Sequence, residues 1–270
     1  MSSFAAAVVL AITLFVLYSA SAWIMLRSVS NERLEPLAWA FSLAALFAHS
    51  DALVRLLRSI GPYSIGLLTA VSLLAWTLAV LACLIAIERP PRALSAVLFG
   101  SAAIGATATG AAHPDAGSAA PGWELTAHIL LSMAAAALLF AAAATAVLLV
   151  ILDRRLHTRR IAHLPSVLPP LDTLEKVMFR LIGAGFALLT LALFTGFVFV
   201  TNLFAQHLIH KTFLSIVAWV LFGVLLIGRV RFGWRGRFAV RWTLAGCVVL
   251  ALAYFGSKFV LEHLLGRHWG

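Results

Sequence analysis

Residues 125–152 read LTAHILLSMAAAALLFAAAATAVLLVIL, a stretch without Asp, Glu, Lys or Arg. A transmembrane helix needs about 20 consecutive, mainly apolar residues, so this stretch is long enough to cross a bilayer. The whole chain has the same character, since 63% of its 270 residues are hydrophobic and only 11% are charged. With a mean hydropathy of +1.02, it has too few polar residues to surround a water-soluble core, and we expect it to fold within a membrane.

Further stretches of similar length and hydropathy lie on both sides of this one. The expected spans are residues 4–26, 37–57, 65–87, 93–111, 125–152, 177–201, 212–228 and 239–262. Helices satisfy their backbone groups internally, and the chain lacks the short alternating segments of a transmembrane barrel. We therefore expect an all-α fold, a polytopic bundle of about eight transmembrane helices, in which residues 1–270 form a single integral membrane domain.

Basic residues indicate the orientation of the bundle. Most of the 20 Lys and Arg residues fall in alternate loops, chiefly between residues 153 and 180 and between residues 229 and 241. Because cytoplasmic loops are enriched in Lys and Arg, these loops are expected in the cytoplasm and both termini outside. Arg55 and Arg58 lie on the outer side against this trend, and Asp51 is one helical turn from Arg55 and able to pair with it.

The longest cytoplasmic segment contains a helix-start signal. Pro169 and Pro170 are followed by Asp172, with Glu175 three residues later. This spacing is typical of a capping box, in which an acidic side chain in the first turn binds a free backbone amide. The sixth helix is therefore expected to begin before its span does.

Several function classes lose their support on motif grounds. Cys83 and Cys247 lie in separate spans, and the chain has no CxxC or CxxCH motif, so it is neither a thiol oxidoreductase nor a covalent c-type haem carrier. Walker, HExxH and GxSxG motifs are absent as well. The basic residues that give the chain its net charge of +10 lie mainly between spans. This position favours membrane lipids with anionic headgroups over nucleic acid as partners. We expect a binding or chaperone-like role and not an enzyme.

Histidine is the residue type left to carry chemistry. His49 lies in the outer half of the second span, where ionisable side chains are rare and often functional. The alternative for His49 is a neutral imidazole that is hydrogen-bonded to a neighbouring helix. His128 opens the fifth span at the outer interface. If their helices face each other, His49 and His128 are candidate axial ligands of a non-covalent, b-type haem iron.

The other histidines carry weaker signals. His207 and His210 are three residues apart, so they share a face if their segment is helical. They are candidates to bind a metal, to cover the edge of a cofactor, or to lie solvated at the interface. His157 and His163 fall in the basic cytoplasmic loop, where we expect them to be solvated.

Three stretches carry a resemblance to a known family, with GWRGR and LAYFGSKFV as their most specific pieces. They are AHILLSMAAAALLFAAAATAVLLVILDRRL at 127–156, PPLDTLEKVMFRLIGAGFALLTLALFTGFVF at 169–199, and AWVLFGVLLIGRVRFGWRGRFAVRWTLAGCVVLALAYFGSKFV at 218–260. They resemble cytochrome c assembly membrane proteins of the CcsA and HemX-like type, in particular the short YpjD-type branch of the bacterial inner membrane. This implies a multi-pass inner-membrane protein of cytochrome c biogenesis, with other maturation proteins as partners.

The resemblance also implies roles for particular residues. A histidine that opens this helix and one within an earlier span are associated in the family with haem held near the outer face for delivery to apocytochrome c. Carried over, these positions are His128 and His49. The larger members have a tryptophan-rich segment with a WxWD core, which residues 199–219 lack, and a further histidine where this chain has Ile227 or Gly228. His207 or His210 is a candidate replacement for that ligand.

Other functions stay open on the sequence alone. Imidazole ligands suit Ni, Co, Cu or Zn, so divalent metal transport or its regulation is one alternative, although the spans lack charged pathway residues. A b-type haem redox protein that exchanges electrons with quinone would use the same His49 and His128. A regulatory subunit without a cofactor is a further alternative.

Overall fold

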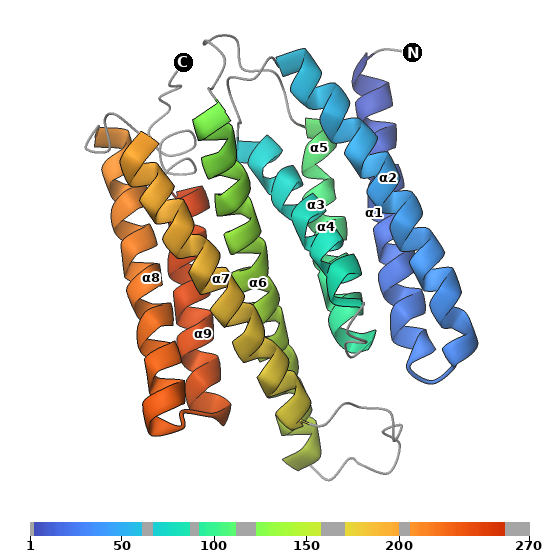
Figure 1. The fold of residues 1–270 in the computed structure, drawn as a ribbon. Coiled ribbons are helices and arrows are strands. Elements are labelled where there is room, and N and C mark those ends of the chain that lie inside the picture. Colours follow the sequence, from blue (N-terminus) through green and yellow to red (C-terminus); the bar gives the residue numbers. More distant parts are fainter. Residues whose placement is uncertain are drawn as a thin grey trace. The chain divides into compact units, whose positions relative to one another are not determined.

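A computed structural model describes residues 3–60, 67–86, 92–111, 123–157, 171–199 and 206–256 (Figure 1). All regular secondary structure in these ranges is helical. The elements in chain order are α1 (Ser3–Ser28), η1 (Glu32–Leu34), α2 (Glu35–Ile60), α3 (Leu67–Ala86), α4 (Arg92–Ala106), α5 (Ala108–Ala111), α6 (Trp123–His157), α7 (Leu171–Phe199), α8 (Gln206–Phe232), α9 (Gly236–Ala251) and the π-helical turn η3 (Leu252–Gly256).

The expected all-α architecture is confirmed within the described ranges. Eight helical segments there are long and apolar enough to cross a membrane, and they coincide with the expected spans. The helix α7 begins at Leu171, before the span expected from residue 177, as the helix-start signal predicts. The last expected span, 239–262, is described only as far as Gly256. The orientation with both termini outside stays a prediction.

Contacts divide the described helices into two compact units. In unit 1, which holds α1 to α5, α1 and α3 each pack against both α2 and α4. In unit 2, which holds α6 to η3, α6 and α8 each pack against both α7 and α9. Each unit is thus a ring of four long helices whose first member contacts the fourth (Figure 1). That residues 1–270 form a single domain stays a prediction.

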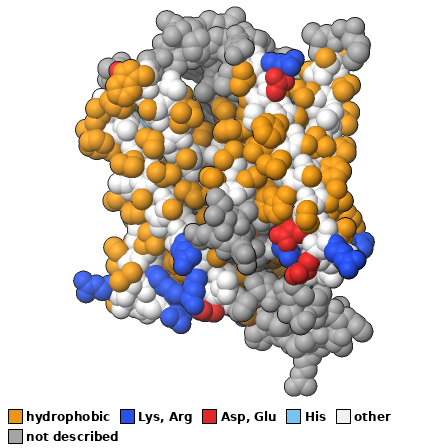
Figure 2. Space-filling view, turned by 45° about the vertical axis from the view of Figure 1, so that its right-hand side comes forward, with side chains coloured by type: hydrophobic (Ala, Val, Ile, Leu, Met, Phe, Trp, Pro, Cys, Tyr) orange, Lys and Arg blue, Asp and Glu red, His pale blue; other side chains and the backbone are white. Residues whose placement is uncertain are grey.

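The packing of the helices is that of a membrane bundle. Large apolar side chains cover the helix flanks, with Phe47 74% and Phe197 72% exposed, while charged side chains gather near the helix ends (Figure 2). Small residues lie inside, since Ala135 and Ala142 of α6 are completely buried. A Cβ on Gly185 of α7 would lie 2.7 Å from Leu139 of α6, so these two backbones approach closely.

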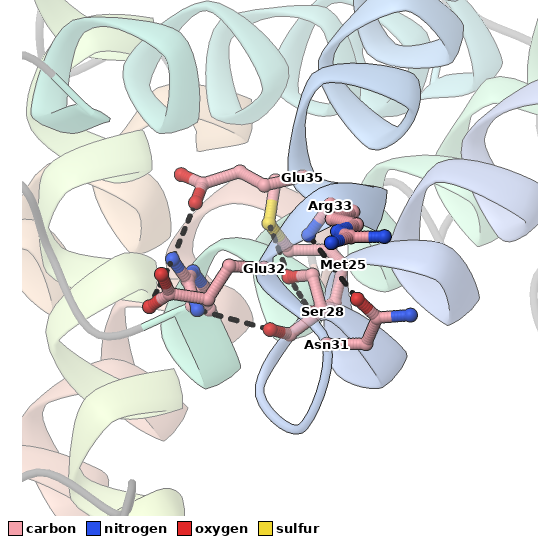
Figure 3. Close-up of polar contacts among 7 residues, drawn as sticks. Met25, Ser28, Asn31, Glu32, Arg33 and Glu35 are labelled. Carbon is pink, nitrogen blue, oxygen red and sulfur yellow. Dashed lines mark hydrogen bonds and ion pairs between the residues drawn. The ribbon is translucent and has the colours of Figure 1, made fainter.

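An arginine ties the turn between α1 and α2 to the start of α4. Arg92 donates to the Ser28 carbonyl at 2.9 Å, and its guanidinium lies 2.6 Å from a carboxylate oxygen of Glu35 and 3.3 Å from one of Glu32. Figure 3 shows Glu32 and Glu35 approaching the same guanidinium from this turn. Because a guanidinium carries donors in a fixed planar fork, three acceptors around it define the position of α4 in unit 1.

A second ionic cluster joins α7, α8 and α9. The Glu175 carboxylate of α7 accepts from Arg229 of α8 at 2.7 Å and from the backbone N–H of Gly236, the first residue of α9, at 3.3 Å. Arg229 also donates to the Trp234 carbonyl in the intervening turn at 3.2 Å. The Glu175 carboxylate, which the sequence suggested as part of a helix cap, therefore links three helices of unit 2.

This cluster generates a prediction about stability. Glu175→Ala should lower the free energy of unfolding by about 3 kcal/mol, because it leaves Arg229 uncompensated in a mostly buried site. Asp172→Ala is the matched control, since it removes an exposed pair with Lys176 from the same helix turn. Thermal unfolding in one detergent compares the variants, and the control should leave the midpoint almost unchanged. Equal midpoints for the two variants would contradict this role.

Candidate functional site

His49 lies at the centre of unit 1, where it contacts hydroxyl groups from three other segments. Its side chain is completely buried. The ring Nδ1 is 3.4 Å from the Tyr18 hydroxyl of α1, and Nε2 is 3.0 Å from the Ser72 hydroxyl of α3. The Thr109 hydroxyl of α5 lies 3.3 Å from Nε2 and 2.6 Å from Ser72. Both ring nitrogens thus have partners in this conformation.

A break in the fourth helix of unit 1 supplies one of these hydroxyls. The helix α4 ends at Ala106, and α5 resumes at Ala108 after a one-residue turn. At that turn the Thr107 hydroxyl donates to the Ile104 carbonyl at 2.7 Å, which satisfies an acceptor at the helix end. On the first helix, Tyr18 is held by stacking on Phe99, with ring centroids 6.4 Å apart. Backbone geometry and aromatic packing thus place the hydroxyls around His49.

His128 lies near the start of α6 in unit 2, and its environment differs. Its side chain is half-buried, and its Nδ1 lies 3.1 Å from the Thr195 hydroxyl of α7. That hydroxyl donates its single proton to the Ala192 carbonyl at 3.0 Å. A Thr195 hydroxyl that donates to Ala192 accepts from His128, so we infer that the imidazole proton is on Nδ1 and the lone pair on Nε2. The Ala192 carbonyl also faces the imidazole, and no described side chain hydrogen-bonds to Nε2.

The ring of His128 also lies directly against the α7 backbone. A Cβ on Gly196 would be 2.9 Å from Cε1 of the imidazole, closer than real Cβ atoms approach other atoms. Any side chain at this position would force the imidazole to shift, so Thr195 and Gly196 together define the height and orientation of the ring. An imidazole whose second nitrogen donates to a fixed acceptor is the usual state of a metal-ligating histidine.

Nearby, η3 ties the end of α9 to α6. The Tyr254 hydroxyl donates to the Ser132 carbonyl at 2.9 Å, one helical turn along α6 from His128. Single π-helical turns are frequent at functional sites. This contact belongs to the segment LAYFGSKFV, although the sequence did not indicate the partner of the tyrosine.

The candidate residues differ in what the structure describes of them. His49 belongs to unit 1 and His128 to unit 2. His207 and His210 lie in the first turn of α8, and their side chains are outside the described residues. Within the described part of the chain, no group of three or more His, Cys, Asp or Glu side chains is arranged to hold a metal ion.

Five residues that contact the two imidazoles were not identified from the sequence. They are Tyr18, Ser72, Thr109, Thr195 and Gly196. The available signal was the presence of hydroxyl residues and a glycine within apolar spans. That signal does not indicate which of the many such residues face a histidine.

Comparison with known proteins identifies the family. The model of the family described as cytochrome c assembly protein matches residues 1–265. The chain belongs to this family. The resemblance noted for residues 127–260 is thereby confirmed. Membership of the cytochrome c assembly protein family also extends to the first four spans, which contain His49.

Individual members of the cytochrome c assembly protein family match over shorter stretches. The inner membrane protein YpjD of Escherichia coli K12 is 39% identical over 144 residues, which are 53% of this chain and 54% of that protein. The cytochrome c biogenesis protein CcsA of Synechocystis is 27% identical over 121 residues, 44% of this chain and 36% of that protein. The chain thus spans about half the length of these curated relatives, or less. No solved structure matches the chain.

The contact between Gly196 and His128 generates a second prediction. Gly196→Ala should displace the imidazole from Thr195 and lower the free energy of unfolding by roughly 1–3 kcal/mol through overpacking. Gly183→Ala, on the same helix, is the matched control because a Cβ there meets nothing within 4 Å. The control should be neutral or stabilising by up to about 1 kcal/mol, since alanine favours helix. Denaturation midpoints compare the two, and a neutral Gly196→Ala variant would refute the tight contact.

Proposed function

We propose that this protein binds haem through His128 and handles it during cytochrome c biogenesis, as a binding or chaperone-like protein of the bacterial inner membrane. Membership of the cytochrome c assembly family supports the process. Two relatives are named a cytochrome c biogenesis protein and an inner membrane protein, which agrees with both parts of the proposal.

The arrangement of His128 and Thr195 is the observation that carries the proposal. A neutral imidazole binds iron through a nitrogen lone pair, and the hydrogen bond to Thr195 leaves that lone pair on Nε2. The contact with Gly196 limits rotation of the ring, so the direction of the lone pair is limited as well. His128 therefore fits an axial haem ligand without rearrangement of its own contacts.

The surroundings of His128 suit an apolar cofactor. Leu125, which lies one turn before His128 on the same face of the helix, is 41% exposed, so apolar surface is available beside the imidazole. Bound haem would supply an iron centre that takes axial ligands. The residues of this chain hold and orient the imidazole through Thr195 and Gly196.

His49 fits the same role only after a change of partners. Its Nε2 would have to leave Ser72 and Thr109 before it reached iron, whereas Tyr18 already holds Nδ1. Ligation by His49 stays a prediction from the sequence, as do a b-type haem and the participation of His207 and His210. The present contacts of His49 match the alternative of an imidazole hydrogen-bonded to neighbouring helices.

Visible absorption spectra of the detergent-purified protein test the proposal. The wild type, supplemented with haem, should show a haem spectrum before and after dithionite reduction, and His128→Ala should lose or shift it because the axial imidazole is removed. His49→Ala tests the second ligand separately. His163→Ala, in the basic loop, serves as the histidine control and should leave the spectrum unchanged.

The outcomes separate the alternatives. A haem spectrum that is identical in the wild type and His128→Ala, or absent from the wild type after supplementation, would refute ligation by His128. Reduction of the bound haem by quinol would instead favour a b-type redox protein over a carrier.

A further inference from the structure

The turn between α8 and α9 carries an exposed surface of arginines and aromatic rings that the proposed function does not use. We propose that this surface binds the headgroup of an anionic membrane phospholipid. We call it the arginine–aromatic surface, and it consists of Arg231, Phe232, Trp234, Arg235, Phe238 and Trp242.

The rings of this surface form one connected cluster. The centroid of Trp234 lies 4.5 Å from that of Phe238, 5.7 Å from that of Trp242 and 6.2 Å from that of Phe232. Phe232 is nevertheless 73% exposed and Phe238 43% exposed, and Val230 beside them is 82% exposed. A cluster that is packed internally and open outward offers apolar area to acyl chains.

Among the described residues, the arginine–aromatic surface keeps an excess of positive charge, although Lys176 and, to a smaller extent, Arg235 lower the pKa of the Asp172 carboxyl. The acidic groups described at this end of the unit each have a basic partner: Asp153 pairs with Arg237, Asp172 with Lys176 and Glu175 with Arg229. Arg231 and Arg235 are exposed. No ion pair joins either of them to an acidic side chain among the described residues. An anion therefore complements the surface, and guanidinium groups suit the oxygens of a phosphate.

The backbone of the turn is held in one conformation. Gly233 and Gly236 have φ of 66° and 60°, a region that favours glycine. The Trp234 N–H donates to the Gly228 carbonyl at 3.2 Å, and Glu175 holds the first amide of α9. Arg231 and Arg235 are therefore carried on a fixed backbone, which lowers the entropy lost when a ligand binds.

The position of the turn identifies the occupant as a lipid. The span Lys211–Phe232 ends and the span Gly236–Tyr254 begins at this turn, so it lies where the chain leaves the hydrocarbon region. Aromatic rings favour that level, and basic groups there attract anionic lipids. A phospholipid provides a phosphate for Arg231 and Arg235 together with acyl chains for Phe232 and Phe238. A free phosphate or a nucleic acid would leave the apolar part of the surface uncovered.

Native mass spectrometry of the detergent-solubilised full-length protein tests this proposal. Phosphatidylglycerol and phosphatidylcholine with identical acyl chains are titrated against the wild type and Arg231→Gln/Arg235→Gln. The wild type should retain phosphatidylglycerol preferentially. The double variant should bind it roughly tenfold more weakly, because each basic group at the surface contributes to anionic lipid binding.

A charge-matched control distinguishes a specific lipid-binding site from general electrostatic attraction between a basic protein and anionic lipid. Arg154→Gln/Arg155→Gln removes the same charge from exposed positions on α6, outside the arginine–aromatic surface. Its affinity for phosphatidylglycerol should stay within about twofold of the wild type, since screening limits the reach of exposed charges. Equal retention of the two lipids by the wild type, or an equal loss of affinity in both double variants, would overturn the proposal.

Discussion

A polar side chain inside a bilayer has no water beside it, so its hydrogen-bond partner must come from its own helix or from another one. Most of the described Ser and Thr residues use their own helix, as Thr145 and Thr243 do by donating to the carbonyl four residues earlier. Histidine cannot do the same with both ring nitrogens. His49 and His128 instead contact hydroxyls of other helices, and these contacts join the helices to one another.

The histidines of the two units make related hydrogen bonds, but different partners face their second ring nitrogens. In each ring of four helices, an imidazole and a hydroxyl join the first helix to the second: Tyr18 with His49 in unit 1, and His128 with Thr195 in unit 2. The fourth helix of each unit changes geometry near its end, at Thr107 and at η3. In unit 1, the altered segment places the Thr109 hydroxyl within hydrogen-bond distance of Nε2 of His49. In unit 2, Tyr254 of η3 donates to the α6 backbone and not to His128. No described side chain hydrogen-bonds to Nε2 of His128, which is why unit 2 carries the haem proposal.

Properties that depend on composition and short spacing were predictable from the sequence. Hydropathy located the spans, and the spacing of Asp51 and Arg55 indicated an ion pair that the structure shows at 2.8 Å. The partners of the histidines were not predictable, because Thr109 is 60 residues from His49 and Thr195 is 67 residues from His128. Such contacts depend on the rotation of each helix about its axis, which many apolar residues specify together. The contact of Glu175 with Arg229 was not predictable for a related reason, since a local capping pattern cannot reveal an arginine 54 residues away.

The tautomer of His128 tests most directly the claim that its Nε2 lone pair is available to bind iron. Solid-state NMR of the haem-free protein in lipid, labelled with ¹⁵N-histidine and assigned through His128→Ala, reports which ring nitrogen carries the proton. The hydrogen bond to Thr195 predicts a protonated Nδ1 and an unprotonated Nε2, and Thr195→Val should abolish that preference. A proton on Nε2 in the wild type would mean that the lone pair points at Thr195, and it would contradict an imidazole prepared to bind iron.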